Sequence, residues 1–138
     1  MVKKQFLIFL TLLFFDQVSK IIVNTTNLSI DFKILAITLV KNTGAIWGSF
    51  KDSNVAFIWI SLIAVGVLMH SYDEFPKKSY PFLLLLFAGV IGNLIDRLFR
   101  GYVIDFINFK IWPVFNFADT YITIGVIGLI FYMWNEKN

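Results

Sequence analysis

The sequence predicts a mainly α membrane protein, a bundle of four transmembrane helices with a small β-sheet on the membrane surface. Three observations predict this fold class. Of the 138 residues, 58% are hydrophobic and 18% aromatic, and the mean hydropathy is +0.75, which is more apolar surface than a soluble core of this size can bury. Apolar runs long enough to cross a bilayer recur along the chain. One stretch between them alternates apolar and polar residues, as a half-buried strand does.

Four apolar segments are the candidate transmembrane helices, because the hydrocarbon core of a bilayer needs ~20 apolar residues per helical crossing. The first contains Asp16 and Lys20, the second carries no charge, the third is shorter, and the fourth reaches full length only if Asp119 lies at the interface. We therefore expect one integral membrane domain over residues 1–138. Its crossings are expected at about 5–23, 53–72, 79–95 and 116–135, the last within the apolar run Ile111–Asn135.

The N-terminal segment, with Lys3 and Lys4 before an apolar run, also has the basic start of a cleavable signal peptide. It lacks the small-residue cleavage site of such peptides, since Phe14, Phe15 and Asp16 follow the apolar run. A retained first helix is therefore expected. Four crossings place both termini on one side. Lys and Arg are nearly balanced between the two sides, and the basic pair before the first helix favours cytoplasmic termini.

The composition excludes several kinds of chemistry. The absence of cysteine excludes a disulfide framework, a thiol nucleophile and a cysteine metal site. The single histidine, His70, leaves no histidine cluster for zinc, so no metal and no cofactor are expected. The net charge of +3 comes from basic residues scattered among the apolar segments. Membrane lipids are therefore expected as partners, and nucleic acid is not.

The connection after the first apolar segment predicts short β-strands. Leu28–Ile34 alternates apolar and polar residues, and a second β-like stretch, Ile37–Lys41, follows it. Open sheet edges cannot lie in lipid hydrocarbon, so these strands are expected on the membrane surface. A small sheet there would shape a cleft for an extended peptide.

Ionisable residues in or near lipid are costly, so each needs a partner or a purpose. Asp16 and Lys20 are four residues apart on one face of the predicted first helix, where they are expected to form an ion pair that supports the fold. For the adjacent Asp96 and Arg97, at the end of the third segment, an interfacial salt bridge is one open interpretation.

Asp105 and Asp119 are the candidate catalytic residues. Asp105 lies within an apolar run, where desolvation raises the pKa of a lone carboxyl. Asp119 stands three residues after Asn116, a pattern that helix capping alone would explain. Both are expected on the same membrane face, and two neighbouring carboxylates share one proton. The ionised partner takes a proton from water while the protonated one polarises a carbonyl or protonates the leaving amine.

The order of five sequence blocks resembles the lipoprotein signal peptidase family, signal peptidase II. The resemblance covers nearly the whole chain and rests on the combination, since any one block alone is weak. The blocks are Asp16-Gln17-Val18-Ser19-Lys20, Asn42-Thr43-Gly44-Ala45, Gly92-Asn93-Leu94-Ile95-Asp96-Arg97, Gly101-Tyr102-Val103-Ile104-Asp105-Phe106 and Asn116-Phe117-Ala118-Asp119.

The resemblance implies an aspartic endopeptidase of the bacterial cytoplasmic (inner) membrane, with its active site at the extracytoplasmic face. The small sheet would then be an extracytoplasmic β-sheet cradle. Its substrates would be prolipoproteins, cut on the N-terminal side of a diacylglyceryl-modified cysteine, and globomycin-type peptides would inhibit it. A monomer is expected. The resemblance assigns catalysis to Asp105 and Asp119, substrate binding to Asn42, Asn93, Arg97 and Asn116, and structural support to Asp16, Lys20, Asp96 and Gly44.

Two alternatives and four departures accompany this interpretation. A small proton-coupled transporter would also keep acids among apolar helices, although it predicts them near mid-membrane. A noncatalytic assembly factor would leave the pairing of Asp105 with Asp119 unexplained.

The departures from the family's common residues affect the expected shape of the pocket and no catalytic or polar cleft position. They are Ile46, Trp47, Ala88 and Ile104.

Overall fold

The computed structural model describes residues 2–44 and 53–136, so Ile46 and Trp47 lie outside the described residues. Within these ranges the fold has four long helices and three strands. Two short 3-10 helices, η2 (Tyr72–Glu74) and η3 (Lys77–Ser79), connect the second long helix to the third. The long helices are α1 (Val2–Thr26), α2 (Asn54–His70), α3 (Tyr80–Arg100) and α4 (Phe117–Glu136), and the strands are β1 (Ile30–Asp31), β2 (Ala36–Asn42) and β3 (Val103–Asn108).

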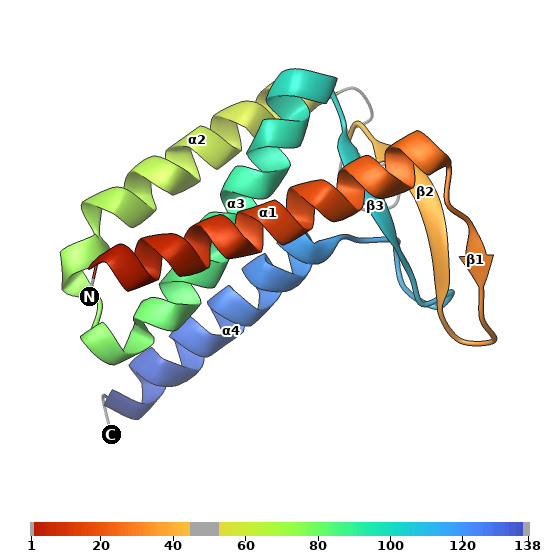
Figure 1. Cartoon of the computed structure of the whole chain (residues 1–138). Helices are drawn as coiled ribbons and strands as arrows, with labels where there is room; N and C mark the ends of the chain where they lie inside the picture. The colour runs from red at the N-terminus through yellow and green to blue at the C-terminus, as the bar shows by residue number, and fades with distance from the viewer. Residues whose placement is uncertain (1, 45–52, 137–138) are drawn as a thin grey trace.

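The helix α3 is the centre of the bundle. It packs against α1, α2 and α4, and its contact with α4 is the most extensive in the fold. Figure 1 shows that the two termini and the connection between α2 and α3 lie at one end of the bundle, while the sheet lies at the other end. The connection from α1 to α2, which contains β1 and β2, and the connection from α3 to α4, which contains β3, therefore meet at the sheet end.

Three helices in the described part of the chain, α1, α3 and α4, are long and apolar enough to cross a membrane, and α2 is a shorter apolar helix of 17 residues. Large hydrophobic side chains such as Phe6, Trp59 and Phe131 are exposed on their outer faces, as lipid contact requires. The helix α3 continues five residues beyond the expected end at Ile95. The charged side chains of this added turn are accommodated because Asp96 and Arg100, four residues apart, form an ion pair.

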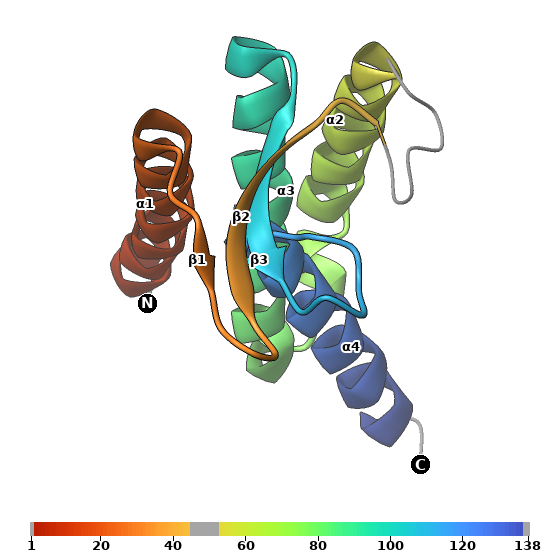
Figure 2. The ribbon, with the colours of Figure 1, turned by 90° about the vertical axis from the view of Figure 1, so that its right-hand side faces the viewer.

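The sheet is antiparallel with the order β1-β2-β3 (Figure 2). The expected strand at Leu28–Ile34 is confirmed only for the two residues of β1, because the chain reverses at once: the Phe32 N–H donates to the Leu35 carbonyl at 2.8 Å. The second strand, β2, extends the expected Ile37–Lys41 by one residue at each end. The strand β3 is not predicted by the sequence.

The strand β3 pairs with β2 and lies above a small core formed by Val23, Ile104 and Phe106. Gly101, with φ of +78°, ends α3 in the left-handed conformation that glycine adopts without steric cost, and the chain turns from it directly into β3. This turn brings the side chain of Asp105 back over the end of the bundle.

Candidate active site

Asp105 on β3 and Asp119 in the first turn of α4 line the same groove at the sheet end of the bundle. The groove has a volume of about 1240 Å³. Asn42 of β2 and Arg97 of α3 also line it, and the connection from Phe109 to Phe115 forms a largely apolar wall. The structure therefore brings both expected carboxylates to one open site between the sheet and the helices.

Asp105 is 2% exposed, and both of its carboxyl oxygens accept hydrogen bonds. Asn42 Nδ2 donates to Oδ2 at 2.9 Å, and Asn116 Nδ2 donates to Oδ1 at 2.7 Å. Asn42 reaches the carboxylate because it lies two residues beyond Val40, the strand partner of Asp105, on the same face of the sheet. Burial, and then the charge of Asp119, raise the pKa of Asp105 to about 7.

Asp119 combines a helix cap with a place in the groove. Asn116 N donates to Asp119 Oδ2 at 3.2 Å, and Asp119 N donates to Asn116 Oδ1 at 2.9 Å, so the two residues cap the start of α4 reciprocally. The other carboxyl oxygen, Oδ1, accepts from Asn93 Nδ2 at 2.7 Å. Capping is thus present as the sequence suggested, and it leaves Asp119 directed into the same groove as Asp105.

Three asparagines present their NH₂ groups to the two carboxylates, because each has its amide oxygen held by another donor. Gly44 N donates to Asn42 Oδ1 at 3.0 Å, Asp119 N donates to Asn116 Oδ1, and Lys20 Nζ donates to Asn93 Oδ1 at 3.0 Å. An amide whose oxygen is engaged on one side must turn its nitrogen to the other.

A buried ion network lies below the groove. Lys20 Nζ is 2.9 Å from Asp16 Oδ2 and 2.9 Å from Asp96 Oδ2, and all three side chains are fully buried. The expected pair of Asp16 and Lys20 is therefore confirmed. Asp16 Oδ1 also accepts from Ala118 N at 2.9 Å, which ties α1 to the start of α4.

The interpretation of Asp96 and Arg97 as a salt bridge, which the sequence left open, is wrong. Neighbouring residues of a helix point in different directions, and Asp96 pairs with Lys20 and Arg100 instead. The Arg97 guanidinium lies 5.0 Å from the centre of the Phe57 ring, and its charge acts on Asp119 and Asp105 across the groove.

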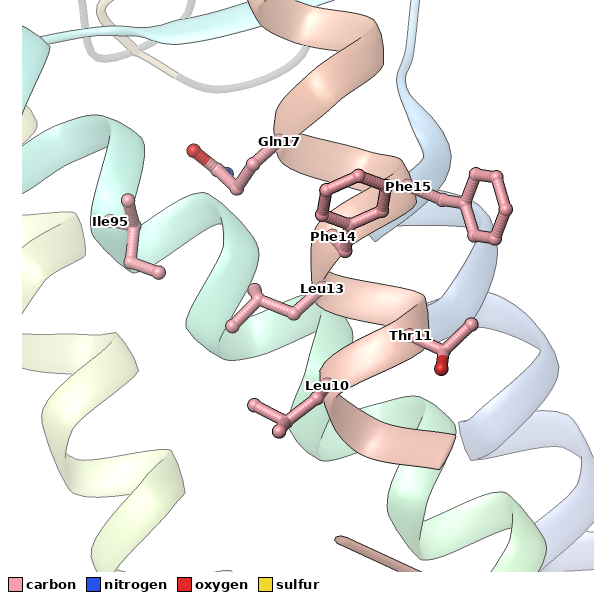
Figure 3. A pocket seen from close by; sticks show the side chains of 7 residues that line it. All are labelled: Leu10, Thr11, Leu13, Phe14, Phe15, Gln17 and Ile95. Atoms are coloured by element: carbon pink, nitrogen blue, oxygen red, sulfur yellow. The ribbon is translucent and has the colours of Figure 1, made fainter. Parts of the chain in front are cut away.

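Sequence reasoning missed Gln17 as a member of the network. Its Nε2 donates to Asp16 Oδ2, Asp96 Oδ1 and the Gly92 carbonyl at 3.1 to 3.2 Å, and its Oε1 accepts from Arg100. Its place between Asp16 and Lys20 in the first sequence block was the available signal. Gln17 also borders a second, largely apolar hollow of about 630 Å³ on the flank of α1, which neither catalytic candidate lines (Figure 3).

Two of the departures from the family pattern lie within the described residues and away from the groove surface. Ala88 and Ile104 are both fully buried, and neither lines the groove. Ile104 belongs to the core beneath β3. Their effect on the pocket is therefore limited to how they support the elements around it.

Known proteins resemble this chain over nearly its whole length. A sequence profile of the family "Signal peptidase (SPase) II" matches residues 8–135. The lipoprotein signal peptidase of Halothermothrix orenii is 32% identical over 96% of this chain and 96% of that protein. The one of Fusobacterium nucleatum is 39% identical over 89% of this chain and 81% of that protein. A solved structure of a bacterial membrane enzyme superposes with a TM-score of 0.91 at 33% sequence identity. The match covers 100% of this chain and 92% of the chain of that enzyme.

The apolar helices and the likeness to solved membrane enzymes define the class, a multi-pass membrane enzyme of mainly helical fold with a small antiparallel sheet. More particularly, the chain belongs to the signal peptidase II family, and it is an aspartic peptidase that removes signal peptides from prolipoproteins. The transporter and the noncatalytic assembly factor considered for the sequence are therefore both wrong.

Proposed function

We propose that Asp105 and Asp119 form the catalytic pair of this peptidase, and that the groove they line binds the precursor around its cleavage site. The observation that carries the proposal is the arrangement of three asparagines whose NH₂ groups all point at these two carboxylates. Such donors stabilise negative charge on the carboxylates and hold them in a fixed orientation. A pair retained only for capping α4 would not need donors on both members.

The cleavage step follows from the unequal surroundings of the two acids. Asp105, whose pKa is raised to about 7 by burial and by the charge of Asp119, holds the shared proton, and the more exposed Asp119 is ionised. A water molecule attacks the scissile carbonyl carbon and gives a proton to Asp119. Asp105 gives its proton to the carbonyl oxygen. The carbon–nitrogen bond then breaks as a proton passes to the leaving amine, giving a new carboxyl terminus and a new amino terminus.

The substrate position follows from the same groove. Arg97, Asn42 and the wall from Phe109 to Phe115 offer one positive charge, one amide and a broad apolar surface. This composition suits a peptide that carries a lipid chain close to its cleavage site, as a diacylglyceryl-modified cysteine does. Each acyl CH₂ that stays buried contributes ~0.8 kcal/mol to binding. We therefore infer that cleavage falls just before that cysteine and depends on its lipid. Metal independence stays a prediction.

The experiment that tests the pair replaces Asp105 or Asp119 with asparagine in the full chain. Asparagine keeps the size of aspartate and caps a helix nearly as well, but it cannot exchange the proton that the mechanism moves. Each change should lower cleavage of a lipidated precursor peptide by about 10²- to 10⁴-fold, the range typical of general acid–base groups, while the protein stays folded and membrane-inserted.

The matched control is Asp31→Asn. Asp31 lies on β1, where its largely exposed side chain pairs with Lys110 at the surface, and its loss should leave cleavage unchanged. An unlipidated precursor at equal concentration should be cleaved far more slowly by the parent. Normal turnover by folded Asp119→Asn protein would remove Asp119 from the mechanism, and equal cleavage of the two precursors would reject recognition of the lipid.

A further inference from the structure

Lys20 is a buried cation that the cleavage step does not use. It lies on α1 with its side chain fully buried, and it does not line the groove. A buried ammonium is costly unless every proton has an acceptor. The groups that accept hydrogen bonds from the Lys20 ammonium therefore indicate its role.

The three protons of the Lys20 ammonium match three acceptors on two helices. Two are carboxyl oxygens, Asp16 Oδ2 and Asp96 Oδ2, each at 2.9 Å, and they neutralise the charge. The third is the amide oxygen of Asn93 at 3.0 Å, which is neutral. The Asp96 carboxylate joins α1 to α3, the Asp16 carboxylate pairs within α1, and the bond to Asn93 is not needed for charge balance.

The bond from Lys20 decides which way Asn93 faces. An ammonium can only donate, so Asn93 must turn its oxygen toward Lys20 and its nitrogen away. That nitrogen then donates to Asp119 Oδ1 at 2.7 Å. With the amide rotated by half a turn, its oxygen would face the carboxylate and repel it.

The same bond reaches the second aspartate through Asn116. Asn116 Nδ2 donates to Asp105 Oδ1 at 2.7 Å and, more weakly, to Asn93 Oδ1 at 3.3 Å. Asn93 Oδ1, which accepts from Lys20, therefore also accepts from the Asn116 amide. The ammonium thus orients Asn93 directly, whereas Asn116, whose oxygen Asp119 N holds, is linked to it only through this longer bond.

We propose that Lys20 is a positioning residue of the aspartate pair, which fixes the Asn93 amide so that its nitrogen faces Asp119. This inference rests on the proposed function, because it concerns the same two carboxylates. It gives Lys20 a role beyond support of the fold, since the turnover rate, and not only stability, depends on its donor.

Two double variants separate the donor from the ion pair. Asp16→Asn/Lys20→Met and Asp16→Asn/Lys20→Gln each remove one positive and one negative charge, and the amide that replaces the Asp16 carboxylate keeps an oxygen for the Ala118 N–H. Methionine and glutamine are of similar length, but only glutamine can donate to Asn93. The kcat of the Gln variant should exceed that of the Met variant by about tenfold, with KM within about twofold and equal thermal unfolding midpoints. Equal kcat values in two folded variants would overturn the proposal.

The network control is Arg100→Met. Arg100 pairs with Asp96 and Gln17 and makes no contact with Asn93, so its loss should lower the unfolding midpoint and leave kcat unchanged. A fall in kcat as large as that of the Met double variant would reduce Lys20 to a structural role and overturn the proposal.

A measurement on the parent decides the case if neither double variant folds. With ¹⁵N-labelled asparagine, the Asn93 side chain should give two separate, slowly exchanging N–H signals, assigned by their loss in Asn93→Asp. Signals that exchange as fast as those of an exposed amide would overturn the proposal. Loss of cleavage in Asp105→Asn and Asp119→Asn, combined with equal kcat in the two double variants, would reject this inference alone. Retained cleavage in the single variants would reject the proposed function instead.

Discussion

At the scale of single residues, the proposed mechanism makes the surroundings of Asp105 decisive for how cleavage depends on pH. In that mechanism the working state has one carboxylate protonated and one ionised, and burial together with the charge of Asp119 raises the pKa of Asp105 to about 7. Below that pH Asp105 keeps its proton, and above it both carboxylates are ionised. We expect kcat/KM for a lipidated precursor to be bell-shaped in pH, with its alkaline limb near pH 7. Initial rates between pH 4 and 9 measure it.

The same pKa has a consequence for stability, which provides an independent check. A carboxyl whose pKa is raised in the folded state favours folding below its unfolded pKa, and this contribution is lost as the pH rises through about 7. The thermal unfolding midpoint of the parent should therefore fall between pH 5 and pH 8 more than that of Asp105→Asn. An alkaline limb above pH 9 together with parallel stability curves would contradict the environment described for Asp105.

Which residues form the site could largely be predicted from the sequence, whereas their hydrogen bonds could not. Few ionisable groups occur in so apolar a chain, so Asp105 and Asp119 stand out, and three of the five sequence blocks supply the asparagines. The direction of each amide depends on donors from other elements, such as Gly44 N and Lys20 Nζ. Sequence neighbours were a poor guide in one case. Asp96 pairs with Arg100 of its own helix and with Lys20 of α1, and not with the adjacent Arg97.

At the scale of elements, the close packing of α3 against α1 and α4 depends on Gly92. A Cβ at this position would lie 2.6 Å from Asp16 Oδ2 and 3.3 Å from the Ala118 Cβ. Asp16 cannot move aside freely, since Lys20 and Ala118 both hold its carboxylate. We expect Gly92→Ala to lower the free energy of unfolding by about 1–3 kcal/mol, as overpacking typically does. Thermal or denaturant unfolding in detergent micelles measures the change.

The matched control for Gly92 is Gly66→Ala on α2. No atom lies within 4 Å of a Cβ built there, so the substitution meets open space. Alanine is the better helix former by about 0.5–1 kcal/mol, and the protein should be unchanged or slightly more stable. Equal stability of the two variants would mean that α3 does not need this close approach.

The helices could be predicted more fully than the strands, for a physical reason. Apolar runs identify helices directly, and only the polar residues near their ends blurred the bounds, as at the end of α3. The first four residues of β3 are buried without alternation, so their pattern does not distinguish a strand from a continuing apolar helix. Its pairing with β2 depends on chain reversal at Gly101, which is a property of tertiary structure.

At the scale of the whole molecule, the arrangement of the ends predicts the topology. The termini lie at one end of the bundle and the sheet at the other (Figure 1), and residues of the sheet line the groove. The basic pair Lys3 and Lys4 favours cytoplasmic termini, so we expect the sheet on the outer face. A reporter that works only outside the cytoplasm should be active when fused after Ile34, in the exposed turn between β1 and β2, and inactive when fused at Asn138. Activity at Asn138 alone would invert the orientation.

The ion network also bears on how the chain enters the bilayer. Asp16 and Lys20 are one turn apart on α1, and Asp96 and Arg100 are one turn apart on α3, so each helix carries its own countercharge. A lone charged side chain in the middle of a helix costs about 2.5–3.5 kcal/mol during insertion. An opposite charge one turn away on the same helix offsets part of that cost, although neither helix is neutral as a whole. The bonds between helices, from Lys20 and Gln17 to Asp96, require both helices to be in place. We therefore expect each helix to enter lipid with its own ion pair formed, and the bonds between helices to follow.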